Sequence, residues 1–421
     1  MKSETAIEIP RVEDFFLARQ PILDRDQSIV AYELLFRRAG FGAADVSDDL
    51  SATASVIAHA FELGMDQVIG NSLGFFNVDA AVLMSDIVAF LPPRNTMLEI
   101  LETVVVTPDI LARIAELRQA GYRFALDDVI GDSENLRQLL PSLSIVKIDI
   151  AQTAPELLAP LCVMFKGTRV KLLAEKVETR EEFARCLALG FDLFQGYYFA
   201  RPVIISGRKL TPSQMTVLQI MALLEADADT AELDRCIKRD AAIGISLLRL
   251  VNTPAVGAVR RIDSLSQALL VLGRRQLQRW LQIMLYAEEC RGAERVSPLL
   301  ALAATRGKLL ELMAQKRDPR DRALADRAFA VGIMSLMDAL FGIPMANILE
   351  HMPVADDVRA ALLAREGMFG DMLQLAEYLE RMRDRTDQAI SAFERLQLST
   401  EDIAAMQIAA FKWSDSIAQG I

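Results

Sequence analysis

Histidine is almost absent from this sequence, and its scarcity excludes several kinds of active site. Only His59 and His351 occur among 421 residues. Two histidines are too few for a metal centre built on many imidazoles, and they argue against a Ser-His-Asp triad. Isolated cysteines indicate reduced thiols in a cytoplasmic protein rather than a disulfide framework. No CxxC spacing occurs among the four cysteines, which are Cys162, Cys186, Cys236 and Cys290.

Long apolar runs and an excess of positive charge are missing as well. No uninterrupted apolar run reaches the roughly 18 residues that a membrane span needs, and the segment MKSETAIEIPRVED has no apolar signal-peptide core. We therefore expect a cytoplasmic protein with no membrane partner. The formal net charge is −11, which argues against nucleic acid as a partner because phosphate backbones require a basic surface. A small phosphorylated ligand is still compatible, since a local cation or a bound metal can hold it.

Hydrophobic residues are abundant, at 52% of the chain. A chain of this length predicts two domains. Over residues 12–203, short β-like runs alternate with helical segments, which predicts a parallel sheet closed into a TIM-like (β/α) barrel. Over residues 206–421 the strand signals cease, and apolar residues recur at i, i+3 and i+4 between helix caps. We predict an all-helical second domain there.

Polar residues stand at the ends of most predicted strands. In chain order these residues are Glu33, Asn77, Glu99, Asp127, Asp128, Lys147, Asp149, Glu175 and Gln195. Reacting groups of barrel enzymes lie where strands end and βα-loops begin, so the series predicts one shared cavity. So many carboxylates repel one another unless cations neutralise them. Hard oxygen ligands suit Mg²⁺ or Mn²⁺ rather than zinc, and paired divalent ions are a usual device for hydrolysing a phosphodiester.

A structural interpretation competes with the metal site, most clearly at the adjacent Asp127 and Asp128. Two aspartates after a short apolar run are a common turn signal. Any single carboxylate of the series is more often a loop cap or a salt-bridge partner. The series is stronger than its members because nearly every predicted strand contributes a polar residue at the same end.

The motifs that contain these residues resemble the EAL family of cyclic di-GMP phosphodiesterases. The motif that names the family, Glu-Ala-Leu-x-Arg, corresponds to YELLFR at Tyr32–Arg37, in which Leu34 replaces the alanine. The remaining motifs follow in family order, from FNVD and EILE through LDDVIGDSE, VKID and AEKVET to FQGYYFARP. The resemblance extends from about Phe16 to Pro202.

This resemblance implies ligands for two metal ions. A first Mg²⁺ or Mn²⁺ would be held by Glu33, Asn77, Glu99 and Asp127. Asp128 would be shared with a second ion. On this basis the two adjacent aspartates are a metal site rather than a turn.

The resemblance also implies roles around the ions. Lys147 and Glu175 would position or deprotonate the attacking water, with Gln195 in support. Arg37 would hold a ligand phosphate, a role for which its bidentate guanidinium is suited. Glu102 would anchor the lid loop.

The second half resembles a different module, the HDOD domain. The segment DRCIKRDAAIGISLLRLVNTP, followed by SLSQALLVLGRRQLQRWL, is similar to the two most recognisable helical stretches of that domain. An EAL-like half before an HDOD half is a known bacterial signalling architecture. A metal phosphohydrolase of the HD type needs a His-Asp pair and further histidines, whereas this half has only His351, which we interpret as a helix-end residue. We expect no metal cofactor in this domain, and an unidentified signalling protein as its partner.

Two departures from the EAL pattern bear on activity. After the two aspartates the family has Phe-Gly-Thr-Gly, whereas residues 129–132 here read Val-Ile-Gly-Asp. Asp132 and Glu134 add negative charge where a dianionic substrate must approach. Lys176 replaces the family's glycine directly after Glu175, where its ammonium could pair with a carboxylate. The retained metal ligands indicate a catalytic site, whereas the altered lid loop indicates little hydrolysis of cyclic di-GMP.

Three functions are open at this point. In the first, an EAL-like domain of low or no hydrolytic activity acts as a sensor or regulator in cyclic di-GMP signalling, with the HDOD domain as protein-interaction output. In the second, an active metal-dependent phosphodiesterase yields linear pGpG and is regulated by the HDOD domain. In the third, the chain is a nucleotide-independent structural scaffold. The sequence identifies neither the partner nor the pathway, and it leaves open whether the chain forms a homodimer.

Overall fold

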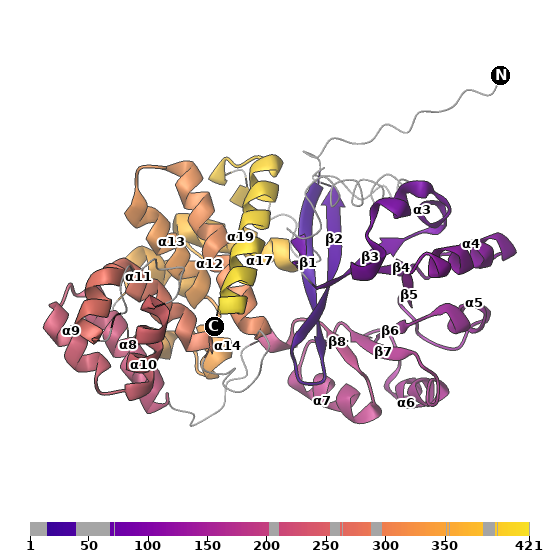
Figure 1. Cartoon of the computed structure of the whole chain (residues 1–421), viewed down its shortest axis with the longest axis horizontal. Coiled ribbons are helices and arrows are strands. Elements are labelled where there is room, and N and C mark those ends of the chain that lie inside the picture. The colour runs from indigo at the N-terminus through magenta and orange to yellow at the C-terminus, as the bar shows by residue number, and fades with distance from the viewer. Residues whose placement is uncertain are drawn as a thin grey trace, which may run out of the picture. The chain divides into compact units, whose positions relative to one another are not determined.

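The structure is a computed structural model in which the chain forms two compact units (Figure 1). The first unit contains Met1–Arg201 together with Leu375–Gly420, and the second contains Pro202–Gln374. The residues that the structure describes are 15–38, 68–70, 72–201, 210–252, 262, 264–287, 297–350, 352, 354–381, 392–393 and 395–420. His351, which we interpret as a helix-end residue, lies outside the described residues.

The first unit is a closed barrel whose eight strands follow one another in chain order. The strands are β1 (Phe15–Asp24), β2 (Ile29–Arg38), β3 (Leu73–Val78), β4 (Thr96–Ile100), β5 (Arg123–Leu126), β6 (Ile145–Asp149), β7 (Lys171–Glu175) and β8 (Leu193–Gln195). Strands β2 to β8 pair in parallel. The predicted TIM-like barrel is thereby confirmed.

The barrel departs from an all-parallel sheet at its first strand. β1 pairs antiparallel with both β2 and β8. A short turn joins β1 to β2, in which Asp24 Oδ1 accepts hydrogen bonds from the backbone N–H groups of Asp26 and Ser28. Neighbouring strands joined by so short a turn can pair only antiparallel, because a parallel pair needs a long crossover.

Helices follow the later strands of the barrel, as the sequence predicts. They are α3 (Ala80–Met84), α4 (Pro108–Gln119), α5 (Glu134–Leu139), α6 (Pro155–Met164) and α7 (Arg180–Leu189), with short 3₁₀ turns η3 (Asp86–Phe90), η4 (Pro93–Asn95), η5 (Leu140–Ser142) and η6 (Tyr198–Ala200). α7 begins at a capping box between Thr179 and Glu182, and it ends at Gly190 in a left-handed conformation. The caps therefore place the ends of this helix where sequence predicts them.

The interior of the barrel is filled by an apolar layer with one residue from each strand. Its members are Ile22, Ala31, Phe75, Met97, Ala125, Ile145, Leu173 and Leu193. Side chains alternate between the two faces of a strand, so residues two positions apart point the same way. A second inward layer must therefore lie directly on the first.

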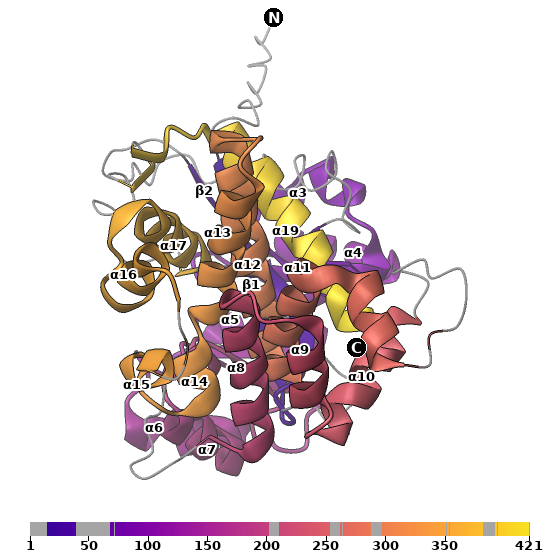
Figure 2. The ribbon, with the colours of Figure 1, turned by 90° about the vertical axis from the view of Figure 1, so that its left-hand side faces the viewer.

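The second unit is all-helical in its described part, which confirms the predicted change from strands to helices. Its helices are α8 (Pro212–Glu225), α9 (Thr230–Ile237), α10 (Ala241–Val251), α11 (Leu265–Ala287), α12 (Pro298–Arg317), α13 (Arg322–Met334), α14 (Met337–Phe341), α15 (Met345–Glu350) and α16 (Asp356–Ala364). α12 and α13 pack side by side (Figure 2). Gly332 permits this close approach, because a Cβ there would lie 2.6 Å from the backbone of Arg306. No helix in the described residues is long and apolar enough to cross a membrane.

The C-terminal helices divide the chain differently from the expected helical domain over 206–421. α17 (Gly367–Arg381) begins in the second unit and ends in the first, and α19 (Thr400–Gly420) belongs wholly to the first. α19 packs on β1, where Gln407 Nε2 donates to the carbonyl oxygen of Leu17 at 2.6 Å. The reason is local to β1. Its turn to β2 supplies no crossover helix, and α19 covers the strand instead.

Candidate functional site

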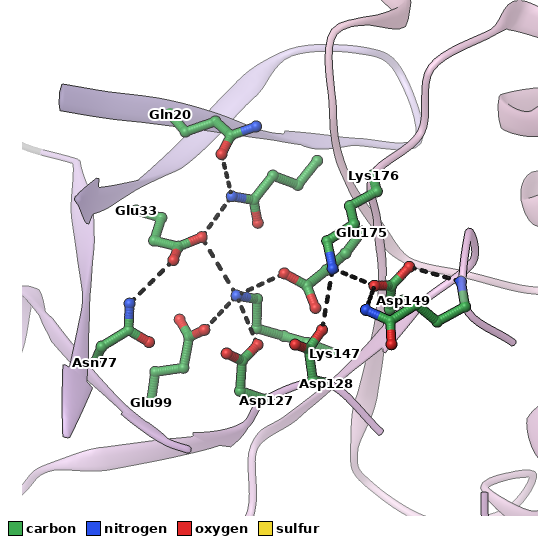
Figure 3. A network of polar contacts seen from close by, with 12 residues as sticks. Gln20, Glu33, Asn77, Glu99, Asp127, Asp128, Lys147, Asp149, Glu175 and Lys176 are labelled. Carbon is green, nitrogen blue, oxygen red and sulfur yellow. Dashed lines mark hydrogen bonds and ion pairs between the residues drawn. The ribbon is translucent and has the colours of Figure 1, made fainter. Parts of the chain in front are cut away.

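The inward layer of side chains next to the apolar layer of the barrel is polar. Figure 3 shows the contacts among these polar side chains. Along β2 to β8, each polar residue stands two positions after an apolar layer residue; on the antiparallel β1 it stands two positions before one. Its members are Gln20, Glu33, Asn77, Glu99, Asp127, Lys147, Glu175 and Gln195. Strand alternation alone therefore brings seven of the predicted site residues together. Gln20 is the residue that sequence reasoning missed.

Lys147 lies among the carboxylates of this layer. Its side chain is only 1% exposed, and its ammonium forms an ion pair with each of four acidic side chains. The distances from Nζ are 2.9 Å to Glu175, 3.1 Å to Asp127 and 3.3 Å to Glu33, with Glu99 also in contact. One ammonium cannot balance four carboxylates. The layer therefore keeps a surplus of buried negative charge that favours a further cation.

The pKa values of these groups reflect that surplus. Burial, reinforced by the neighbouring carboxylate of Glu33, raises the pKa of Glu99 well above its usual range. Burial also raises the pKa of Glu175 to about 8, although Lys147 opposes the shift. Burial disfavours the charged form of Lys147, yet the carboxylates led by that of Glu175 outweigh it and raise the lysine pKa. The cluster thus holds Lys147 charged while it disfavours ionisation of Glu99 and Glu175. Burial also raises the pKa of Asp127, but Lys147 helps to outweigh burial and lowers the value.

Side-chain amides orient Glu33 within the layer. Asn77 Nδ2 donates to Glu33 Oε1 at 3.2 Å. Gln195 Nε2 donates to Glu33 Oε2 and also to Gln20 Oε1, the latter at 3.1 Å. The carboxylate of Glu33 is therefore held by amide donors from β3 and β8 and by Lys147. The alternation in ARQPI, with Gln20 two residues before Ile22, was the signal for the extra glutamine.

Several buried oxygens of this layer have no hydrogen-bond donor within the described part of the chain. They are Asn77 Oδ1, Glu99 Oε2, Glu175 Oε2 and Gln195 Oε1. A buried acceptor without a donor is costly. Carboxylate oxygens of Glu33, Glu99 and Glu175 also lie within 4.8 Å of one another. An all-oxygen set of this kind fits Mg²⁺ or Mn²⁺.

The oxygen geometry groups the ligands differently from the family pattern. Glu33 and Glu99 join Glu175, which the resemblance assigns to the attacking water. Asp127 instead groups with Asp128 and Glu102, whose oxygens also lie within 4.8 Å of one another. This second group is more exposed than the first. Glu102, expected to anchor a lid, is thus also close enough to share a cation with the two aspartates.

Lys176 lies beside the second group. Its ammonium is 3.6 Å from Asp128 Oδ1 and forms an ion pair with Asp149 Oδ2. Burial raises the pKa of Asp149, but the hydrogen bond from Lys176 helps to outweigh burial and lowers the value. Lys176 has a φ of 56° and Asp128 a φ of 44°. Such left-handed backbone favours glycine, which accounts for the glycine of the family pattern at the lysine position.

The segment that follows Asp127 and Asp128 packs against the barrel at its first residue, Val129. Val129 is buried, and its backbone N–H donates to the carbonyl oxygen of Lys147 at 3.0 Å. Ile130 is 56% exposed. Asp132, expected to add charge at the cavity, is instead paired with Arg137 on the protein surface. The side chain of Arg37 lies outside the described residues, so its predicted phosphate contact stays a prediction.

The glycine after Gln195 is required by a close approach of β7 and β8. The Val177 N–H donates to the Gln195 carbonyl oxygen at 3.0 Å, and the Val177 carbonyl oxygen accepts from Tyr198 at 3.2 Å. Gly196 lies between these bonds with a φ of 151°. A Cβ at this position would lie 2.0 Å from the Val177 carbonyl oxygen. No other residue type fits without moving Gln195.

Gly196→Ala is therefore expected to lower the free energy of unfolding by about 1–3 kcal/mol, the usual cost of forcing extra volume into packed structure. Urea unfolding measures the loss. Gly190→Ala is a matched control, because Gly190 has a φ of 99° but no described atom within 4 Å of its would-be Cβ. Equal losses for both variants would mean that backbone strain, and not the contact with Val177, requires the glycine.

Known families match the same two parts of the chain. The EAL domain model matches residues 77–202 and the HDOD domain model residues 210–350. The match to the EAL model begins after YELLFR.

Relatives match over nearly the whole length. The cyclic di-GMP phosphodiesterase CdgJ of Vibrio cholerae serotype O1 is 33% identical over 410 residues, which cover 96% of this chain and 93% of CdgJ. The protein YuxH of Bacillus subtilis is 28% identical over 409 residues, covering 96% and 98%. A solved structure of a standalone EAL protein from Vibrio cholerae O395, bound to c-di-GMP, has a TM-score of 0.37 at 26% identity and covers 46% of this chain and 93% of that one. With an EAL domain before an HDOD domain and a full-length relative in CdgJ, the chain belongs to the EAL–HDOD family of cyclic di-GMP signalling proteins.

Proposed function

We propose that the barrel binds cyclic di-GMP at the polar layer together with Mg²⁺ or Mn²⁺, and that it hydrolyses this ligand slowly or not at all. In this role the EAL domain is a sensor, and the HDOD domain is the output that binds a signalling protein and holds no metal. The proposal rests on the buried oxygens of the layer that have no hydrogen-bond donor in the described part of the chain. They are acceptors that the protein leaves without donors, in a place where its surplus negative charge favours a cation.

Different residues of the layer would have different roles at such a site. Glu33, Glu99 and Glu175 would hold one ion, with Asn77 Oδ1 as a neutral ligand. A bound divalent ion would polarise a phosphate oxygen and make a bound water more acidic. Lys147 is then free to place its ammonium against a phosphate oxygen or a water.

Slow turnover is proposed because the second carboxylate group already has a cation beside it. The ammonium of Lys176 contacts Asp128 and Asp149. It competes electrostatically with a second divalent ion, which in-line displacement at a two-metal site would need. A displacement of reacting atoms by about 1 Å can cost on the order of 10²-fold in rate. Ligand binding tolerates such a displacement better than catalysis does.

An active phosphodiesterase is the second candidate, and one observation favours it. The relative CdgJ, which matches this chain over nearly its full length, is a cyclic di-GMP phosphodiesterase. All the carboxylates of the predicted series are retained here. The two candidates differ in rate and not in the site that they use.

A titration of the full-length protein with cyclic di-GMP, with and without Mn²⁺ and followed by product analysis, tests the proposal. We expect binding with Mn²⁺ that weakens on the order of tenfold without it, the effect of losing one charge-assisted contact, and little pGpG. Glu99→Gln should bind no Mn²⁺ and, even with Mn²⁺ present, should bind the ligand as weakly as the natural protein does without the ion. Residual stoichiometric Mn²⁺ would locate a metal site elsewhere, including the HDOD domain. Absence of any binding by the natural protein would leave the scaffold function.

A further inference from the structure

One of the two amides that orient Glu33 also bonds to β1. Gln195, at the end of β8, donates to Glu33 and to Gln20 of β1. β1 and β8 are paired antiparallel, with Ile22 opposite Gln195. A shift of either strand would therefore move the amide that holds the Glu33 carboxylate.

The outer face of β1 is held by the C-terminal helix α19. Arg19 precedes Gln20 and points to the opposite face of the strand, where its side chain is 4% exposed. Its guanidinium donates to both carboxylate oxygens of Asp415, at 2.8 and 2.9 Å. It also lies between two aromatic rings, 4.4 Å from the centroid of Tyr32 and 4.2 Å from that of Phe411. A bidentate, ring-stacked and desolvated pair is among the stronger polar contacts in proteins.

The end of β8 is held by the same C-terminal segment. Tyr197 lies two residues after Gln195, and its hydroxyl donates to Glu380 Oε2 at 2.7 Å. The guanidinium carbon of Arg381 lies 4.4 Å from the centroid of the Tyr197 ring. Gly196, between Gln195 and Tyr197, lies so close to the backbone of Val177 that it has no room for a side chain. A change at Glu380 is therefore passed to Gln195 through only two residues of constrained backbone.

We propose that the end of α17 and the helix α19 position the ligand Glu33. Asp415 of α19 acts on β1, and Glu380 of α17 acts on the end of β8. Asp415 and Glu380 are positioning residues that act through Gln20 and Gln195. This inference rests on the proposed metal site. α17 begins in the second unit and ends in the first.

Mn²⁺ affinity of the full-length protein, measured by calorimetry, is the first readout. Asp415→Asn should weaken binding, by up to the roughly tenfold that loss of a partner bonded directly to a metal ligand costs. Tyr197→Phe removes a single hydroxyl and should weaken binding in the same direction, even if the Asp415 variant folds poorly. Glu401→Gln, at an exposed position on the same helix, should leave affinity unchanged. Unchanged affinity in both folded variants would overturn the inference.

A second readout needs no metal. In the metal-free protein, the side-chain amide resonance of Gln195 should shift in Asp415→Asn and in Tyr197→Phe, because Nε2 moves relative to its two acceptors, Gln20 Oε1 and Glu33 Oε2. Glu401→Gln should leave it in place. If the natural protein binds no Mn²⁺, the proposed function fails, and the amide shift still decides whether the C-terminal segment positions this glutamine. An unmoved resonance in both variants would end the inference whatever the metal result.

Discussion

Purified full-length protein is expected to form little pGpG from cyclic di-GMP with either Mg²⁺ or Mn²⁺, and a repaired variant is expected to form on the order of 10²-fold more. The repair replaces Val-Ile-Gly-Asp at 129–132 with the Phe-Gly-Thr-Gly of the family and changes Lys176→Gly. The physical reason lies at the second carboxylate group, where the ammonium of Lys176 contacts Asp128 and Asp149. Removing it leaves those carboxylates available to a second ion.

At Lys176, the effect of the charge can be separated from the effect of the backbone strain. Lys176→Gly alone removes the cation and relieves the left-handed strain, whereas Lys176→Gln removes the cation and keeps the strain. Gln27→Gly is the matched control for strain, because Gln27 has a φ of 59° in the exposed turn between β1 and β2. We expect both Lys176 variants to gain turnover and the control to gain none. Turnover of ~1 s⁻¹ or more by the natural protein, abolished by Glu33→Ala, would show that the lid and lysine argument is wrong.

Lys147→Met should unfold the metal-free barrel at much lower urea concentration, with a loss of about 3–5 kcal/mol, as for a buried ion pair deprived of one partner. Methionine keeps the length of the side chain but removes the charge that four buried carboxylates contact. Mn²⁺ should restore most of the loss, because a divalent ion supplies the missing positive charge. Urea unfolding with and without Mn²⁺ measures both effects.

Lys171→Met is the control for this experiment. Lys171 begins β7 and is exposed, so its replacement should change stability little with or without the ion. If Mn²⁺ stabilises Lys147→Met no more than it stabilises the natural protein, the ion does not bind among these carboxylates. The proposed metal site would then have to move to the group of Glu102, Asp127 and Asp128.

Periodicity and strand-end polarity were sufficient to predict the barrel and most of its polar layer. Each predicted residue stands at a fixed interval from an apolar residue on the same strand, and alternation converts that interval into a shared cavity. Gln20 was not predicted because its strand runs antiparallel. On that strand the residue that enters the cavity precedes the apolar layer residue. The left-handed backbone at Lys176 could not be predicted from its residue type, since lysine rarely adopts it.

The position of the last helices was also beyond a reading of the sequence. The apolar face of α19 shows that this helix packs on something, and the spacing of its residues does not say on what. Its partners, among them Arg19 and Leu17, lie on a strand at the other end of the sequence. Only the fold brings the two segments together.

The contact between β1 and α19 also sets an order of assembly during translation. Arg19 and Asp415 are separated by 396 positions in the sequence. Domains generally fold as the ribosome delivers them, N-terminal part first, but here the contacts of the first barrel strand with α19 cannot form until the whole helical unit has been synthesised. The long separation makes closure of this contact slow as well. A ribosome that stalls in the HDOD region would thus release a barrel whose first strand lacks its contacts with α19. Complete packing of the EAL domain therefore depends on synthesis of the domain that follows it.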